Sequence, residues 1–439
     1  MQKKRIDVIS LGCSKNLVES ERLLKRLDAK GYKTVFDSDD PRGELVIVNT
    51  CGFISDAKEE SINTILQLGR KKKKGLVGEI AVMGCLSQRY LEELKKELPE
   101  VDRWYGKFDW DRLADSLPDI SNQNIKLKHW ERKLTTPPHS AYLKISEGCN
   151  RFCAFCAIPL ITGRHKSRPI EEIAEEVTSL VKEGVKEFNI IAQDLSSYGT
   201  DLYGKQSLAR LLETLADIPG VKWLRLHYAY PSDFPLEVLE VMRNRENVCN
   251  YIDIALQHIS DKVLSNMRRH ITKEETLALL ATIRQKVPDI KIRTTLMIGF
   301  PGEGEQEFQE LMEFVSQQQF DRLGAFTYSE EDDTNAAKNL PDNIPQAIKE
   351  ERLNKLMAAQ QEIAQSLNDK LVGSIQKVLI DKVEGDFAYG RTQYDSPEVD
   401  PEVIIKTSGL QPGKFVDVKI TEAYPFELIG EIYQYGNQG

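Results

Sequence analysis

Hydrophobic positions in the first hundred residues follow one pattern three times. Each repeat begins with a short apolar run typical of a β-strand and continues with apolar residues at helical spacing. We expect strands at residues 5–11, 44–49 and 79–83, and helices at 16–27, 55–68 and 88–98. A strand that returns to pair in parallel needs a crossover connection, so this order predicts a parallel sheet.

The segment from residue 141 to about 328 alternates strand and helix patterns six times. Its strands are expected to begin near residues 141, 186, 222, 251, 291 and 322, with amphipathic helices such as 169–183 between them. Six units, rather than the eight of a closed barrel, predict a partly open (β/α)6 barrel. In barrels with this connectivity the chemistry lies at the carboxyl ends of the strands.

The last hundred residues change period. Residues 345–371 have the spacing of a long helix, whereas 373–439 alternate with a period of two. Gly and Pro turns separate five short runs in that segment, at 375–380, 387–394, 403–406, 415–420 and 428–433. These runs predict a small antiparallel β-barrel.

The pattern as a whole predicts an α/β protein with several domains. We expect an N-terminal parallel α/β domain (1–120), a linker (121–140), the partial barrel (141–343), a connecting helix (344–372) and the terminal β-barrel (373–439). The linker contains Pro137-Pro138, and tandem prolines stop both helices and central strands.

Composition narrows the class of protein. The chain has 439 residues, of which 41% are hydrophobic and 29% charged, which is ordinary for a globular protein. It has no apolar run of about 18 residues and begins without a signal-peptide pattern, so we expect no membrane span and a cytoplasmic location. Seven cysteines then favour reduced thiols and metal ligation over disulfides.

Three of these cysteines lie within eight residues, directly after the first strand of the partial barrel. Cys149, Cys153 and Cys156 have the spacing Cys-x3-Cys-x2-Cys. Three thiolates can hold three irons of a four-iron cluster and leave the fourth iron open for chemistry. The alternatives are a zinc knuckle, which usually has four Cys or His ligands, and a disulfide.

Three further cysteines follow the three N-terminal strands. Cys13, Cys51 and Cys85 each come just after a strand, where parallel strands place their loops along one edge of the sheet. Any one of them alone is most simply a small buried hydrophobic residue, but three in equivalent positions indicate a second cluster with an open iron. Cys249 lies at the opposite end of its strand and is expected to be structural.

Several motifs resemble a known family. The triplet with Phe155 before its last Cys resembles the radical S-adenosylmethionine (SAM) superfamily signature. Residues 11–21 (LGCSKNLVESE), 191–194 (IAQD) and 293–303 (RTTLMIGFPGE) resemble the methylthiotransferases within it. The closest resemblance is to the branch that modifies an aspartate of a small-subunit ribosomal protein, and it covers nearly the whole chain.

The resemblance implies cofactors and their contacts. It implies two 4Fe-4S clusters and SAM, with the first cluster on Cys149, Cys153 and Cys156 and the second on Cys13, Cys51 and Cys85. Besides Phe155, the SAM contacts that it implies are the following: Gln193, Asp194, Gly299 and Phe300. It implies no catalytic side chain beyond the cluster ligands, and it implies a terminal barrel of the TRAM type.

The resemblance also implies a reaction and partners. One SAM would donate a methyl group to sulfur and a second would be the radical source, so that a methylthio group is added at the β-carbon of an aspartate. The implied substrate is the basic decoding-site ribosomal protein, number twelve of the small subunit, and a flavodoxin-like or similar protein would donate one electron. The alternatives are a tRNA adenosine methylthiotransferase and a non-catalytic iron–sulfur scaffold.

Charge bears on the choice between a protein and an RNA substrate. The whole chain has a net charge of −9, and residues 373–439 hold six Lys or Arg against eleven Asp or Glu, a net of −5. Since binding to RNA phosphates depends on Lys and Arg, direct RNA binding is not expected, and a basic protein would be attracted. The alternative is that the acidity only aids solubility. The basic run 70–74 is most simply a solvated helix end, although it could dock a substrate.

Overall fold

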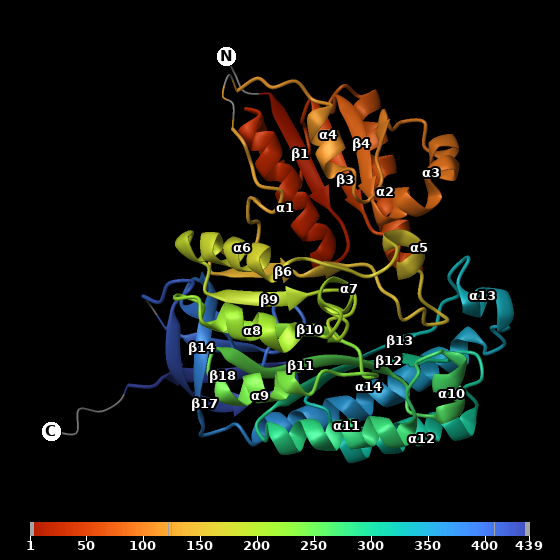
Figure 1. Ribbon diagram of the computed structural model, residues 1–439, viewed down its shortest axis with the longest axis vertical. Helices are drawn as coiled ribbons and strands as arrows, with labels where there is room; N and C mark the ends of the chain where they lie inside the picture. Colours follow the sequence, from red (N-terminus) through yellow and green to blue (C-terminus); the bar gives the residue numbers. More distant parts are fainter. Residues whose placement is uncertain (1–3, 122, 124, 408, 435–439) are drawn as a thin grey trace. The chain divides into compact units, whose positions relative to one another are not determined.

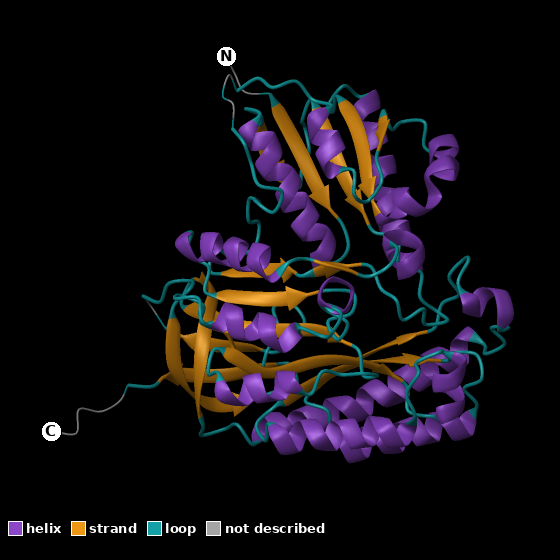
Figure 2. Cartoon of the chain, in the orientation of Figure 1, coloured by secondary structure: helices purple, strands orange, loops and turns teal. Residues whose placement is uncertain are grey.

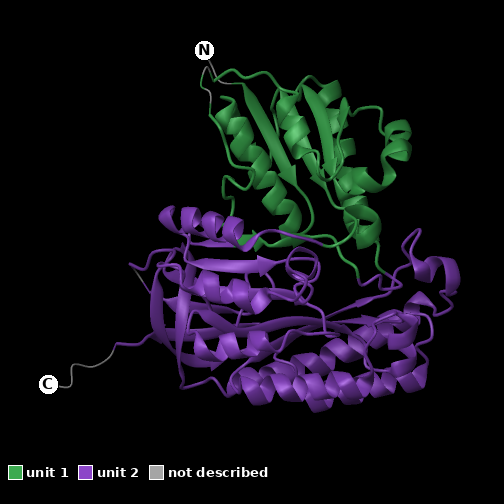
Figure 3. Ribbon diagram, viewed as in Figure 1, with its two compact units in different colours: residues 1–136, 142–150, 156–165 green, residues 137–141, 151–155, 166–439 purple. Residues whose placement is uncertain are grey.

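The computed structural model describes residues 4–121, 123, 125–407 and 409–434. The chain divides into two compact units (Figure 3). Unit 1 comprises residues 1–136, 142–150 and 156–165, and unit 2 comprises 137–141, 151–155 and 166–439. The residue ranges of the two units interleave because the segment of the second cysteine triplet passes from one unit to the other.

Unit 1 is built on a five-stranded sheet with the order β2-β1-β3-β4-β5, and every pair in it is parallel (Figures 1 and 2). Its strands are β1 (Arg5–Ser10), β2 (Lys33–Phe36), β3 (Leu45–Thr50), β4 (Glu79–Gly84) and β5 (Arg103–Trp104). Its helices are α1 (Ser14–Ala29), α2 (Ser55–Lys73), α3 (Cys85–Glu97), α4 (Trp110–Asp115) and α5 (Ile158–Thr162). The parallel sheet and its three expected strands are confirmed, and β2 and β5 are additional edge strands.

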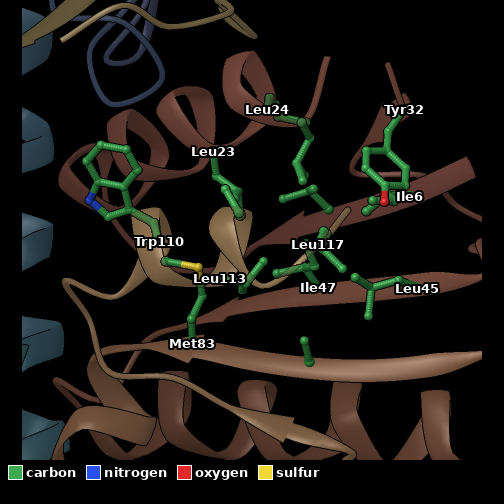
Figure 4. Packing of buried hydrophobic residues seen from close by; sticks show 14 of the residues in the cluster. Ile6, Leu23, Leu24, Tyr32, Leu45, Ile47, Met83, Trp110, Leu113 and Leu117 are labelled. Carbon is green, nitrogen blue, oxygen red and sulfur yellow. The ribbon is translucent and has the colours of Figure 1, made fainter. Parts of the chain in front are cut away.

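Helices pack on both faces of this sheet. On one face α1 and α4 bury Leu23 and Trp110 against Ile6 and Ile47 of the strands (Figure 4). On the other face α2 and α3 bury Ile65 and other apolar side chains. Such two-sided burial explains why β3 is fully buried and reads as a continuous apolar run. The basic run 70–74 forms the carboxyl end of α2, as expected, where Lys71, Lys72 and Lys73 pair with carboxylates.

A six-stranded sheet has the order β13-β12-β11-β10-β9-β6, and unit 2 contains β9 to β13 with the first two residues of β6. Its strands are β6 (Ser140–Lys144), β9 (Glu187–Ile191), β10 (Trp223–Ala229), β11 (Val248–Gln257), β12 (Lys291–Ile298) and β13 (Arg322–Thr327), and β9 to β13 pair in parallel. The short strands β7 (Ser146–Glu147) and β8 (Lys166–Ser167) lie in the chain between β6 and β9. All six expected strands of the partial barrel are confirmed.

Helices separate these strands in the chain, as expected. They are α6 (Ile170–Lys182), α7 (Thr200–Tyr203), α8 (Leu208–Ala216), α9 (Glu237–Asn244), α10 (Asp261–Asn266), α11 (Lys273–Lys286) and α12 (Glu305–Gln318). After β13 come α13 (Asn335–Asn339) and the long α14 (Gln346–Asp369). Helix α14 packs along β13 and α12. None of the helices in the described part of the chain is both long and apolar enough to cross a membrane.

The expected five-stranded terminal barrel is confirmed, and it closes in the order β14-β15-β16-β18-β17. Its strands are β14 (Ile375–Glu384), β15 (Phe387–Thr392), β16 (Glu402–Lys406), β17 (Phe415–Ala423) and β18 (Glu427–Ile432). One pair, β16 with β18, is parallel rather than antiparallel, because β17 lies between them in the chain and pairs with β18 from the other side.

Buried ion pairs join the terminal barrel to the six-stranded sheet within unit 2. Arg391 of β15 donates hydrogen bonds to both carboxylate oxygens of Glu187, at 2.9 and 2.7 Å, and Arg225 donates to the same carboxylate at 3.0 Å. In the loop after β15, Asp395 pairs with Arg322 at 2.7 Å and Asp400 with Arg293 at 2.5 Å. The terminal barrel is therefore fixed to the amino-terminal ends of the sheet strands.

Candidate active site

The cysteines of the N-terminal triplet lie where three neighbouring strands of unit 1 end. Cys13 is the residue before α1, Cys51 follows β3 directly, and Cys85 is the first residue of α3. Because β1, β3 and β4 are adjacent and parallel, all three thiols stand at one edge of the sheet. The amino-terminal ends of α1 and α3 also favour negative charge at this edge.

Small residues allow the thiols to come close together. Gly12 adopts a φ of +93°, and a Cβ atom there would lie 2.7 Å from Cys51 Cβ and 2.9 Å from its Sγ. The Cys85 thiol donates a hydrogen bond to Asn16 Oδ1 at 3.5 Å. Burial raises the pKa of the Cys85 thiol to about 12, an effect opposed by Lys107 and increased by Cys13. The Cys85 thiol thus interacts electrostatically with Lys107 and with Cys13.

Three buried charges and one partly exposed charge lie at the same edge of unit 1. Lys107 Nζ donates to both carboxylate oxygens of Glu19, at 2.9 and 3.1 Å, and Lys144 Nζ donates to Glu19 Oε1 at 2.7 Å. Lys144 Nζ also donates to Glu147 Oε2 at 2.7 Å. Burial disfavours the charged form of Lys107, but Glu19 and Glu147, together with Cys85 and Cys13, outweigh it, so the pKa of Lys107 is raised and the ammonium is kept. We call Glu19, Lys107, Lys144 and Glu147 the charge quartet.

The segment of the second triplet touches the N-terminal triplet within unit 1. Cys149 follows β7, and its N–H donates to the carbonyl of Gly163 at 3.2 Å. Cys85 packs against Ala157 and Ile161 in one buried cluster, and Ala157 follows Cys156 directly. Helix α5, which comes after this triplet, also contacts α3. The structure therefore brings together residues adjoining both triplets.

Cys153 belongs to unit 2, and its surroundings contain residues that the sequence reasoning missed. Arg269 Nη1 donates to Cys153 Sγ at 3.2 Å, and the Tyr230 hydroxyl lies 3.5 Å from the same sulfur. The guanidinium groups of Arg151 and Arg269 lie 4.3 and 4.1 Å from the Tyr230 ring centroid. Hydrogen bonds to sulfur tune iron–sulfur clusters, so Arg269 has a place in this site.

Gln193 and Asp194 follow β9, as expected for residues at a carboxyl strand end. The buried Asp194 carboxylate accepts from Arg151 Nε at 2.8 Å and from the Ser197 hydroxyl at 2.5 Å. Asp194 therefore anchors the loop that carries Arg151, two residues before Cys153. The positive charge of Arg151 is in turn favoured by Asp194, which helps to raise its pKa against the effect of burial.

Gly299 and Phe300 form the turn after β12. The Gly299 N–H donates to Glu303 Oε2 at 2.8 Å, and Arg352 of α14 donates to Glu303 Oε1 at 2.9 Å. The Phe300 ring is fully buried and packs edge-on against Phe155, with 6.1 Å between centroids. The structure thus brings Phe155 and Phe300 together in one core cluster of unit 2.

The donor set fits iron–sulfur clusters. Thiols are the usual ligands of such clusters, and both triplets offer three. Within the described ranges, no group of three or more His, Cys, Asp or Glu side chains is arranged to hold a metal ion. A four-iron cluster makes a different demand, because each thiolate binds its own iron rather than converging on one ion.

Two other features lie away from these strand ends. Cys249 is the second residue of β11, at its amino-terminal end, and is fully buried with Trp223, Tyr251 and Leu379. A cavity of about 1140 Å³ lies beside the same end, where β10 and the end of α9 face the terminal barrel. Neither feature touches the candidate site residues.

Models of three families match the chain. The Radical SAM superfamily matches residues 143–315, the TRAM domain matches 372–432, and the Uncharacterized protein family UPF0004 matches 5–106. A protein of Bacteroides fragilis named "Ribosomal protein uS12 methylthiotransferase RimO" is 56% identical over 434 residues, 98% of this chain and 100% of its own. The proteins of the same name from Phocaeicola vulgatus and Porphyromonas gingivalis are also 56% identical, each over 98% of this chain and 100% of its own. This chain belongs to the RimO family of radical SAM methylthiotransferases.

Solved structures agree with this fold. The cobalamin-bound radical SAM methyltransferase TsrM of Kitasatospora setae has a TM-score of 0.54 and 13% identity, and the match covers 86% of this chain and 77% of that one. At this identity the likeness concerns the fold alone. Membership of the RimO family supports an iron–sulfur cluster and SAM as cofactors, and the resemblance read from the sequence motifs is confirmed.

Proposed function

We propose that this protein adds a methylthio group to the β-carbon of an aspartate in ribosomal protein uS12, using one SAM as methyl donor and one as radical source. The observation that carries the proposal is the packing of Cys85 against Ala157 and Ile161. It puts the N-terminal triplet beside the end of the Cys149–Cys156 segment, as a reaction that uses both requires. The names of the full-length RimO relatives supply the substrate.

We assign one four-iron cluster to each triplet. Cys149, Cys153 and Cys156 would hold the cluster that binds SAM, and Cys13, Cys51 and Cys85 would hold the second. When bound, the clusters and SAM supply the radical and sulfur chemistry, which protein side chains lack. The chain positions these groups with strand ends of two parallel sheets and donates a hydrogen bond to Cys153 from Arg269.

We also assign SAM contacts to five residues near carboxyl strand ends. Gln193 and Asp194 follow β9, Gly299 and Phe300 follow β12, and Phe155 packs against Phe300. The contact between the partly buried Phe155 and the buried Phe300 supports a packing role for both rings, in which they shape the wall of the site and exclude water. We further propose that a protein of the flavodoxin kind donates one electron and that the reaction takes place in the cytoplasm.

Iron content tests the two-cluster assignment. After anaerobic reconstitution the intact chain should bind about eight irons, and replacement of either triplet by Ala should leave about four. Binding of only about four irons by the intact chain, or a preference for zinc, would refute the assignment.

Substrate choice tests the function. The reconstituted protein is given SAM and dithionite together with both purified uS12 and unmodified tRNA, and the products are analysed by mass spectrometry. The proposal expects a methylthio group on an aspartate of uS12 and none on adenosine. Modification of adenosine alone would identify a tRNA methylthiotransferase, and cluster loading without any SAM cleavage would indicate a scaffold.

A further inference from the structure

Lys107 continues the row of thiols along the edge of the unit 1 sheet. The adjacent strands β1, β3 and β4 lead into Cys13, Cys51 and Cys85, and the next strand, β5, leads into Lys107. Hydrogen bonds fix the loop after β5 to the first turn of α3, which begins with Cys85. The Ser87 hydroxyl donates to the Tyr105 carbonyl at 2.7 Å, and the Lys107 N–H donates to Gln88 Oε1 at 3.1 Å.

Helix α1 places the partner of Lys107 on the same side as the thiols. Asn16 accepts the hydrogen bond of the Cys85 thiol at 3.5 Å, and Glu19 lies three residues further on the same face of the helix. Glu19 accepts from Lys107 Nζ at 2.9 Å. The Lys107 ammonium and the Cys85 thiol are thereby bound to the same face of α1.

Three members of the charge quartet are buried, and Glu147 is partly exposed. The side chains of Lys107 and Glu19 are 2% and 1% exposed, and that of Lys144 is 6% exposed. Buried ion pairs add little to stability, because apolar residues of the same volume often serve as well or better. A fixed charge in such a low-dielectric site acts strongly on its neighbours, and Lys107 and the Cys85 thiol bind side chains three residues apart on one face of α1. The quartet is therefore better explained by its electrostatic effect on neighbouring groups than by a contribution to stability.

We propose that the Lys107 ammonium, held by Glu19, tunes the cluster of the N-terminal triplet by favouring its reduced, more negative state. The inference rests on the proposed function, since it needs a cluster on Cys13, Cys51 and Cys85. Reduction adds one negative charge, which a fixed cation stabilises, and the potentials of iron–sulfur clusters depend on local charge. Glu19 has the opposite charge, so it acts in the opposite direction at the same cluster.

The test measures the midpoint potential of the N-terminal cluster alone. The parent is a full-length variant that combines Cys149→Ala, Cys153→Ala and Cys156→Ala. After reconstitution it is titrated with dithionite, and reduction of the cluster is followed by electron paramagnetic resonance. When Lys107→Met is added to this parent, the ratio of reduced to oxidised cluster should fall at least tenfold at a fixed solution potential. For a one-electron couple, tenfold corresponds to about 59 mV. Glu19→Gln should shift the midpoint in the opposite direction.

Two further variants separate charge from packing. Lys107→Arg keeps the charge and should keep the midpoint near the parent's. Arg132→Met removes another buried cation of unit 1, whose Nη1 pairs with Glu21 at 2.6 Å. Glu21 is two residues beyond Glu19 and therefore on another face of α1, so Arg132→Met should leave the midpoint unchanged.

The outcomes distinguish this inference from the proposed function. A parent that binds no iron overturns the second cluster and with it this inference. If the parent binds iron normally but Lys107→Met leaves the midpoint potential unchanged, only this inference is overturned. If Lys107→Met fails to load iron, Glu19→Gln decides, and a midpoint that is unchanged or shifted downward in that variant overturns the role of the pair.

Discussion

At the scale of single residues, the N-terminal triplet depends on close approach between Gly12 and Cys51. The φ of +93° at Gly12 disfavours any residue with a Cβ atom, and that atom would overlap Cys51 Cβ at 2.7 Å. Since the thiol would have to move to relieve the overlap, the thiol geometry of the whole triplet is sensitive to this one glycine.

We therefore predict that Gly12→Ala loses most of the iron bound by the N-terminal triplet. The measurement uses the variant in which Cys149, Cys153 and Cys156 are replaced by Ala. The left-handed conformation alone costs about 1–2 kcal/mol for a residue with a side chain. Gly75→Ala is the matched control, because Gly75 also has a positive φ, +71°, but a Cβ there meets no atom within 4 Å. Equal iron loss in both variants would contradict the prediction.

Sequence spacing identified the cysteines but missed the groups that surround them. The six candidate ligands follow strand patterns, so their positions at strand ends could be predicted. Arg269 reaches Cys153 across 116 residues of chain, and Lys107 reaches Glu19 across 88. No periodicity relates such pairs. A weak signal existed at Lys107, a lysine close behind the aromatic pair 104–105, but it did not distinguish a buried cation from a solvated one.

At the scale of elements, strand and helix order was predicted well and edge strands were not. β2 has four residues, none of them fully buried, and β5 has two, so neither gives a run long enough for its period to be recognised. The central strands were found because each contains at least three consecutive buried residues. Short edge strands form where a neighbouring strand offers hydrogen bonds, and a local pattern does not contain that information.

Helix α14 shows where hydrophobic periodicity fails. A buried apolar face on this helix would be expected to include Ile348, but that side chain is 38% exposed. The buried face is instead largely polar, and consists of Lys349, Arg352, Leu356, Gln360, Ala364 and Asn368. These polar side chains bind groups in the rest of unit 2, for example Gln360 with the Phe320 carbonyl at 2.9 Å. The helical period is correct, but the residue types on the buried face are set by partners distant in sequence.

Arg352 makes this face testable. Arg352→Met leaves the fully buried Glu303 carboxylate without its cation, and loss of one partner of a buried pair costs about 3–5 kcal/mol. We predict a lower urea midpoint for unfolding of unit 2, measured by circular dichroism. Lys355→Met is the control from the same helix, since its pair with Glu351 is exposed and should contribute only about 0–1 kcal/mol. Similar effects of the two changes would contradict the prediction.

At the scale of the whole molecule, net charge was a poor guide to surface charge. The acidic count of the terminal barrel includes Asp381, Asp395 and Asp400, whose side chains are 15%, 1% and 1% exposed and pair with cations of unit 2. These three carboxylates do not contribute to an acidic outer surface. The expected attraction of a basic substrate therefore rests on the remaining acidic residues, and it stays a prediction.

The buried ion pairs at the terminal barrel make stability depend on acid. Burial alone would raise the pKa of Glu187, but Arg391 and Arg225 outweigh burial and hold it well below its usual value of 4.5. The pKa of Asp381 is also lowered, by His139 and Arg391 against burial. A carboxylate with a depressed folded pKa stabilises the fold above its unfolded pKa, and this contribution is lost as the pH falls below it.

We predict that the free energy of unfolding of the protein without iron is nearly constant from about pH 7 to 5 and falls below about pH 4.5. Each depressed carboxylate adds a slope of up to about 1.4 kcal/mol per pH unit. Urea titrations at a series of pH values measure this slope. Glu187→Gln should be less stable at pH 7 and should show a shallower slope in acid, and a slope as steep as that of the unchanged chain would contradict the assignment.

The same contacts decide whether the terminal barrel is a separable module. A chain that ends at residue 372 would lose Arg391 from Glu187, Asp395 from Arg322 and Asp400 from Arg293. Glu187 keeps Arg225, but Arg322 and Arg293 lose their carboxylates. Loss of one partner of a buried pair costs up to about 3–5 kcal/mol, a large part of the roughly 5–15 kcal/mol by which a protein is stable. We predict that this truncated chain does not yield a folded partial barrel.

Solubility and urea unfolding of chains ending at 372 and at 434 test this, because the longer chain keeps every strand of the terminal barrel. A cooperative unfolding transition in the shorter chain, with a midpoint like that of the longer one, would show that the sheet of unit 2 does not need the terminal barrel.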